Sequence, residues 1–147
     1  MPHLSLISPV GELTVFEEDE KIISLDWGRA PEARITPLLM EAKTQLRFYF
    51  QKKLKGFDLP LAPAGTDFQQ RVWRQMQAIP FGETQTYGEI AQKIKSGARP
   101  VGTACGRNPI PIIIPCHRVV SATGLGGYSG AGGLDTKKSL LAFEGAL

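Results

Sequence analysis

The chain of 147 residues has only two cysteines, Cys105 and Cys116, which excludes a framework of several disulfide bonds. Two free thiols are typical of a reducing compartment, so we expect the protein to be cytoplasmic. No apolar run approaches the roughly 20 residues that cross a bilayer, and we expect no contact with a membrane. The first residues also lack the basic segment and apolar stretch of a signal peptide.

Net charge is low as well, at +3, and the composition is that of an ordinary globular protein, with 42% hydrophobic and 21% charged residues. The charge is unevenly distributed. Residues 1–64 carry eight Lys/Arg and nine Asp/Glu, whereas residues 65–147 carry nine and five. A local excess of cations suits a phosphate-bearing partner, although most small basic domains are merely soluble. The second half is therefore a weak candidate for binding nucleic acid.

Apolar and polar residues alternate at period two in the first third, which predicts three short strands. Turns are expected at residues 9–11 and 18–20. Thr36 and Pro37 predict an N-cap and a first helical residue, and an apolar stripe then continues to Leu54, with Gly56 ending the helix. The residues expected to face inward from the strands are Leu4, Leu6, Leu13, Val15, Ile23, Leu25 and Trp27.

The second half reads as mainly helical, so the fold class is α/β, with a small N-terminal sheet and helix followed by a helical domain. A capping box at Thr66 and Gln69 predicts one helix, and Thr86 caps a second over residues 87–94. A turn at 95–97 leads to a third, over 100–106. Two short helices joined by a glycine turn are typical of a helix-turn-helix, although many helical hairpins never touch DNA. We place the domains at 1–63, which includes a proline-rich linker, and 64–147.

The third of these helices is slim, because Gly102, Thr103 and Ala104 offer little side chain for reading base edges. Small residues instead permit the close approach that the minor groove requires. Arg99 is expected just before the helix, extended because Pro100 follows it. Local sequence leaves open whether this arginine is solvated or enters a base stack.

Residues 108–115 hold three prolines and four isoleucines, which predicts a stiff, buried and extended approach to Cys116. A thiolate is the reactive form of cysteine, and a nearby imidazole such as His117 commonly generates it. Adjacent side chains on an extended chain point in opposite directions, so contact between Cys116 and His117 would need a turn or a bridging water. A lone buried cysteine is more often an inert packing residue.

The segment Pro115-Cys116-His117-Arg118-Val119 resembles the active-site signature of the O6-alkylguanine-DNA alkyltransferase family, the methylated-DNA–protein-cysteine methyltransferases. The resemblance implies a ribonuclease H-like N-terminal part and a winged helix-turn-helix-like motif. Residues 1–63 are similar to the family only in the order of their elements. In the rest of the chain the matching segments are 68–73, 79–83, 86–91, 99–102, 108–111, 128–130 and 140–145.

The resemblance implies direct-reversal DNA repair, in which Cys116 irreversibly takes the alkyl group of O6-alkylguanine, methyl included, once per chain. O4-alkylthymine stays open as a second substrate. His117 would act through water as the base, Glu144 would orient His117, and Tyr87 and Ser129 would assist departure of the guanine. Apart from the resemblance, Glu144 is equally a surface glutamate and Tyr87 a core aromatic.

The target base must leave the stack of the duplex, and Arg99 would fill its place. Asn108 would brace the turn at Cys116, Tyr128 would line the base pocket, and the carbonyls of Cys116 and Val119 would read the exocyclic amine. We expect a monomer bound to double-stranded DNA that holds alkylated guanine, nucleoid-associated if the source is prokaryotic. The residues expected to contact DNA are Arg99, Pro100, Gly102, Thr103, Ala104, Arg107 and Arg118.

No cofactor is implied, and no metal is expected, because the zinc ligands of some members are N-terminal cysteines and histidines, and no cysteine precedes Cys105. Three other functions compete. A lesion sensor would bind without transfer, but such members replace the cysteine. A transcription regulator would use the helix-turn-helix alone, and a cysteine hydrolase would turn over an acyl-type substrate.

Overall fold

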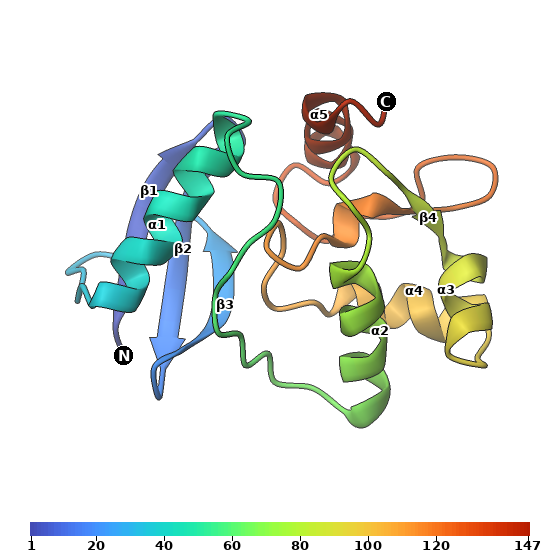
Figure 1. Cartoon of the computed structure of the whole chain (residues 1–147), viewed down its shortest axis with the longest axis horizontal. Coiled ribbons are helices and arrows are strands. Elements are labelled where there is room, and N and C mark those ends of the chain that lie inside the picture. Colours follow the sequence, from blue (N-terminus) through green and yellow to red (C-terminus); the bar gives the residue numbers. More distant parts are fainter. The chain divides into compact units, whose positions relative to one another are not determined.

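The computed structural model describes all 147 residues and divides the chain into two compact units, Met1–Ala64 (unit 1) and Gly65–Leu147 (unit 2). Unit 1 holds the strands β1 (His3–Ser8), β2 (Gly11–Glu18) and β3 (Lys21–Trp27), followed by helix α1 (Pro37–Phe50) (Figure 1). The strands form one antiparallel sheet in the order β1-β2-β3. The predicted meander and helix, and the mixed α/β class, are confirmed.

One face of the sheet packs apolar residues from β1 and β2 into the core of unit 1. The alternation fails in β3, where Ile22 is fully buried and Ile23 is only half-buried, opposite to the prediction. The reason is an irregularity opposite Phe16 and Glu17, where Ile23 of β3 has no partner in β2 and the pairing moves by one residue. A shift of one residue exchanges the two faces of a strand.

Helix α1 begins as predicted, with Pro37 at its first position and the Thr36 hydroxyl accepting a hydrogen bond from the Leu39 N–H at 3.1 Å. It ends at Phe50, six residues before Gly56, so the predicted end was wrong. Lys52 adopts a left-handed φ of 60°, which stops the helix without a glycine.

Unit 2 contains helices α2 (Asp67–Gln77), α3 (Tyr87–Lys93), α4 (Ala98–Gly106) and α5 (Leu134–Glu144), and two-residue strands β4 (Gln85–Thr86) and β5 (Val119–Val120), which pair in parallel. The capping boxes at Thr66 and Thr86 are both present. The Trp73 indole N–H donates to the Ala104 carbonyl at 2.9 Å, which fixes α2 against α4. No helix of the structure has the length and apolar character of a membrane span.

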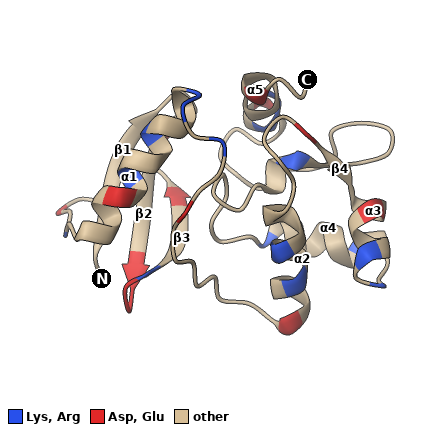
Figure 2. Cartoon of the chain, viewed as in Figure 1, with Lys and Arg blue, Asp and Glu red and all other residues tan.

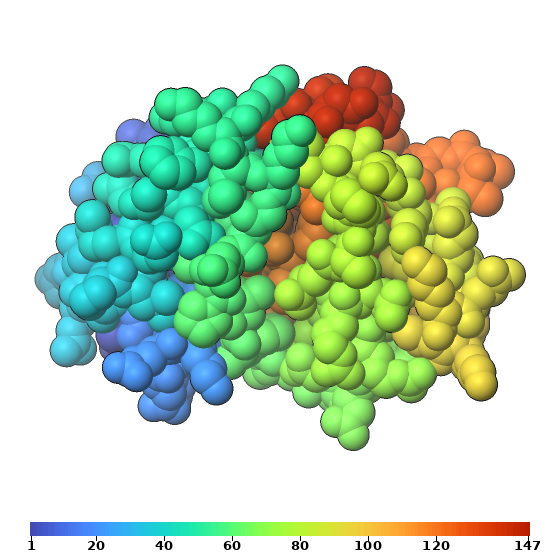
Figure 3. Space-filling model, in the orientation of Figure 1, coloured from blue at the N-terminus to red at the C-terminus, as the bar shows by residue number.

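The glycine-rich chain after β5 stands out from the surface of unit 2 near α3 (Figures 1 and 3). It turns tightly at Ser121–Gly124 and reaches α5 through Gly132 and Gly133, which both have positive φ. Figure 2 shows cations on the visible faces of α2 and α3. The glycine-rich chain forms one wall of the site described below.

Candidate active site

Helix α4 forms a wall of the site with its exposed side. It begins at Ala98, two residues earlier than predicted, with Gly97 as N-cap. Arg99 is therefore helical, and the prediction that it is extended was wrong. Pro100 is accommodated because the N–H groups of a first turn have no partner four residues back. Arg99, Pro100 and Thr103 are exposed, as Gly106 is.

The other side of α4 packs into unit 2. Ala104 is only 2% exposed and its carbonyl accepts the Trp73 hydrogen bond, so its predicted contact with DNA is contradicted. Gly102 is half-buried because the Tyr87 ring lies next to it: a Cβ added to Gly102 would be 3.8 Å from Tyr87 Cδ1. Arg107, the C-cap residue, is exposed, as a DNA-contacting residue must be.

The approach to Cys116 is a buried turn and not the predicted extended segment. Ile112 has a φ of 73°, and residues 116–118 form a 3₁₀ turn. The predicted hydrogen bonds of Asn108 are present: its Nδ2 donates to the Ile114 carbonyl at 2.8 Å, and its Oδ1 accepts from the Ile110 N–H at 3.0 Å. The amide of Asn108 thus closes the turn that delivers the thiol.

Behind the thiol, His117 and Arg118 share one carboxylate, that of Glu144 in the last turn of α5. His117 Nε2 lies 2.8 Å from Glu144 Oε2. Arg118 donates from Nε to Oε1 at 2.8 Å and from Nη2 to Oε2 at 2.9 Å, and its Nη1 donates to the Ile79 carbonyl at 2.7 Å. Arg118 is 5% exposed, so the prediction that it contacts DNA was wrong. Its guanidinium instead compensates the buried charge of Glu144.

The other ring nitrogen of His117, Nδ1, is buried and has no hydrogen-bond partner. Burial lowers the pKa of His117, with the Glu144 hydrogen bond acting in the opposite direction, so the imidazole is neutral near pH 7. Because the Glu144 carboxylate accepts two hydrogen bonds from Arg118 and faces Nε2, the single ring proton belongs on Nε2. Nδ1 of His117, the residue directly after Cys116 in the chain, is then a free acceptor.

Cys116 is 7% exposed, and burial raises the pKa of its thiol. Two groups work against this: a hydrogen bond from Asn108 and the positive charge of Lys137, both of which favour the thiolate. The thiol is therefore at rest in its protonated form, with stabilising groups for the anion already in place.

Lys137 was not predicted from the sequence. It is fully buried, and its Nζ donates to the carbonyls of Val119 at 2.6 Å and Gly127 at 2.9 Å, 5.8 Å from the Tyr87 ring centroid. The signal was present, because Lys137 lies three, four and seven residues before Leu140, Leu141 and Glu144, on the buried face of α5. Its bond occupies one acceptor position of the Val119 carbonyl, which was predicted to read the guanine amine.

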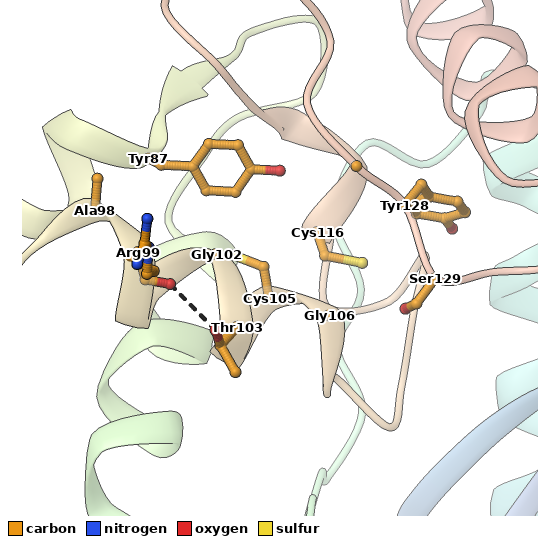
Figure 4. Close-up of a pocket in the computed structure, with 11 residues that line it drawn as sticks. Tyr87, Ala98, Arg99, Gly102, Thr103, Cys105, Gly106, Cys116, Tyr128 and Ser129 are labelled. Atoms are coloured by element: carbon orange, nitrogen blue, oxygen red, sulfur yellow. Dashed lines mark hydrogen bonds between the residues drawn. The ribbon is translucent and has the colours of Figure 1, made fainter.

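Cys116 opens into a cavity of about 660 Å³ between α4, the 3₁₀ turn and the glycine-rich chain. Figure 4 shows Tyr87 on one side of Cys116, and Tyr128 and Ser129 on the other. His117, Glu144, Asn108 and Val119 lie outside the lining. The lining residues are Tyr87, Ala98, Arg99, Gly102, Thr103, Cys105, Gly106, Cys116, Gly127, Tyr128 and Ser129.

Tyr87 is held in the wall by close packing. A Cβ at Gly126 would lie 2.7 Å from Tyr87 Oη, and Gly126 has a φ of 75°, so glycine is required there. Burial raises the pKa of the Tyr87 hydroxyl, which therefore keeps its proton and can donate it. Cys105, the other thiol in the lining, has its pKa raised to about 12 by burial and contacts Met76 Sδ at 3.5 Å, so it acts as a packing residue.

A regulator that reads DNA with a helix-turn-helix has no use for a buried thiol beside its second helix. The placement of Cys116 next to α4, with an imidazole and a carboxylate behind it, instead defines a group-transfer protein that acts at a DNA surface. Two family models agree with this class. Residues 67–146 match the 6-O-methylguanine DNA methyltransferase DNA binding domain, and residues 5–63 match the ribonuclease-like domain of the same family. The chain belongs to the 6-O-methylguanine DNA methyltransferase family.

Individual relatives cover nearly the whole chain. The methylated-DNA–protein-cysteine methyltransferase of Methanosarcina acetivorans is 43% identical over 95% of both chains, and the constitutive enzyme of Bacillus subtilis is 42% identical over 84% of both. Among solved structures, Mycobacterium tuberculosis OGT in complex with DNA is similar with a TM-score of 0.88 and 42% identity, covering 99% of this chain and 94% of that one. These similarities confirm the resemblance inferred from residues 115–119.

Proposed function

We propose that the protein repairs alkylated DNA by moving the alkyl group from O6 of guanine to Sγ of Cys116, once per chain. The observation that carries the proposal is the position of Cys116, which faces the cavity beside α4 while the neutral His117 and its carboxylate partner Glu144 lie behind it. A cavity of this volume is large enough for a purine base. The names of the relatives, methylated-DNA–protein-cysteine methyltransferases, support the same reaction.

In the proposed reaction the Cys116 proton passes through a water molecule to His117 Nδ1, and Glu144 stabilises the resulting imidazolium. The thiolate sulfur then attacks the alkyl carbon. The S–C bond forms as the C–O6 bond breaks, and the electron pair of that bond stays on O6. Tyr87 and Ser129 lie in the cavity wall where a hydroxyl can donate to the leaving guanine. The product is a thioether, which water does not hydrolyse, so the chain is consumed.

A guanine in a duplex hides its O6, so we propose that the base rotates out of the stack into the cavity. Arg99 lines the mouth of this cavity, is exposed, and is the residue proposed to fill the vacancy. Pro100, Gly102, Thr103 and Arg107 are proposed to contact the duplex. We propose that the protein acts as a monomer, and two free thiols support a cytoplasmic location. O4-alkylthymine is a further candidate substrate.

The test is intact and peptide mass spectrometry after incubation with a duplex that contains one O6-methylguanine. We expect one added methyl group on the peptide with Cys116 and unmodified guanine in the DNA. The Cys116→Ser variant should bind the duplex and gain no mass. Binding by the natural protein without a change in mass would overturn transfer and indicate a lesion sensor, and repeated turnover by the variant would overturn the role of Cys116.

A further inference from the structure

Strand β1 forms an edge of the sheet in unit 1, and part of that edge is open. The Glu17 N–H donates to the Pro2 carbonyl, so the alternation of the ladder turns the backbone groups of Leu4 and Leu6 toward β2. The N–H and C=O groups of Ser5 and Ile7 point the other way and form no backbone hydrogen bond. Four strand-forming groups are thus available on one edge.

The chain itself begins to cover this edge and then leaves it. His3 and Arg34 exchange two backbone hydrogen bonds of 3.1 Å, and in the same register Glu32 would come opposite Ser5. Glu32 instead has a φ of 56°, which turns the chain off the edge, and the Ala30 N–H donates to the Ser5 hydroxyl at 3.2 Å. The edge is left open immediately beyond the pair formed by His3 and Arg34.

A groove of about 390 Å³ follows the open edge. Its walls are β1, the segment of residues 29–33 and two cations of α1, Lys43 and Arg47. Arg29, Lys43 and Arg47 form no ion pair, and the groove has only two carboxylates, Glu12 and Glu32. The groove thus offers a row of backbone donors and acceptors with an excess of positive charge.

We propose that this groove binds an extended acidic peptide segment of a partner protein, which adds a strand to β1. Strand addition uses the free N–H and C=O groups of Ser5 and Ile7 for affinity. Alternate side chains of a strand point the same way, so carboxylates at every second residue would lie near Lys43 and Arg47. A nucleic acid fits less well, because the outward carbonyls would face phosphate oxygens. This proposal is independent of the reaction at Cys116.

The test uses a fluorescein-labelled peptide of four Val-Glu repeats, acetylated and amidated, with binding followed by fluorescence anisotropy and by amide chemical shifts. We expect binding with shifts at Ser5 and Ile7. The Ile7→Pro variant removes one unpaired N–H at an edge where proline is tolerated, and should weaken binding about fivefold or more, the effect of one hydrogen bond. Ile7 is 81% exposed, so the matched control Ile7→Ala keeps the N–H and should bind within about twofold of the natural protein.

Further comparisons separate strand addition from its alternatives. The Lys43→Glu/Arg47→Glu double variant should bind a Val-Lys peptide in place of the Val-Glu peptide. A Val-Glu peptide with N-methyl groups on alternate residues should not bind the natural protein. The proposal would be overturned if Ile7→Ala and Ile7→Pro weakened peptide binding equally. It would also be overturned if the groove preferred an eight-nucleotide oligothymidylate, or if the protein formed concentration-dependent dimers that Ile7→Pro abolished.

Discussion

At the scale of single residues, Glu144 links two buried side chains of the site, because its one carboxylate orients His117 and is neutralised by Arg118. Without Arg118, a buried carboxylate next to the imidazole would either take up a proton or pull one onto His117. In both cases His117 Nδ1 would lose its role as a proton acceptor. Arg118 is therefore a positioning residue for the proposed base, and it lies outside the lining of the cavity.

This role predicts that Arg118→Ala destabilises the fold by about 3–5 kcal/mol, since Glu144 is left buried without its partner. Methyl transfer under single-turnover conditions should also slow. Urea unfolding and quenched transfer assays measure the two effects. Arg107→Ala is the matched control, because Arg107 is exposed. It should leave stability within about 0.5 kcal/mol and weaken DNA binding, reducing the salt slope by about 1. If Arg118→Ala instead left stability unchanged and weakened DNA binding, Arg118 would belong to the DNA interface.

Lys137 makes a second residue-level prediction. Its ammonium favours the thiolate of Cys116, so Lys137→Met should raise the pKa of Cys116 further. The rate of transfer at neutral pH should fall, and the rise of rate with pH should move to higher pH. Lys138→Met serves as the control because Lys138 is exposed. A pH–rate profile for Lys137→Met that coincides with that of Lys138→Met would contradict this role of the ammonium.

His117 couples stability to pH. Its pKa is lowered by burial, so the folded chain binds the proton less readily than the unfolded chain, whose histidine titrates near 6.5. The contribution of neutral His117 to stability should therefore be complete above pH 6.5. The free energy of unfolding should decrease as pH falls below 6.5. His117→Gln keeps an N–H for Glu144 and removes the titration, so its stability should depend less on pH in this range. Equal slopes for the two proteins in urea unfolding from pH 7 to 5 would rule this out.

At the scale of elements, α4 combines an inner face that packs on α2 with an outer face of small or exposed residues. We predict that Thr103→Trp weakens binding to duplex DNA about tenfold or more, because a bulky side chain prevents close approach in the minor groove. Stability should change by less than about 0.5 kcal/mol, since Thr103 is exposed. Gln77→Trp, on an exposed position of α2, is the control, and equal DNA affinity of the two variants would exclude α4 as the reading helix.

The starts of three helices, α1, α2 and α3, could be predicted because their signals are local. Thr36, Thr66 and Thr86 each cap a helix within three residues, and all three starts are correct. The left-handed residues Lys52 and Ile112 carry no such signal. The predictions for the end of α1 and for the segment before Cys116 were therefore wrong. The shift that buries Ile22 is likewise a property of strand pairing and not of the alternation within one strand.

For the molecule as a whole, a count of Lys and Arg in the sequence overstates the positive charge that is available to contact DNA. Unit 2 has nine cations, but Arg118 and Lys137 are buried, and seven remain exposed. The burial of Arg118 could not be predicted, because the carboxylate that compensates it is 26 residues away at Glu144. The burial of Lys137 was signalled only by its place on the apolar face of α5, and its carbonyl partner at Val119 is 18 residues away. The proposed nucleophile, by contrast, was inferred from a motif of five adjacent residues.

Burial of Cys116 also has a consequence for how long the protein stays usable. A chain that acts only once loses its whole capacity if its sulfur reacts with anything else first. Peroxides and other small electrophiles consume thiolates in proportion to their abundance and exposure. With 7% of Cys116 exposed and its pKa raised by burial, the resting thiol reacts slowly with such compounds. The same packing that restricts the substrate therefore preserves unused copies between lesions.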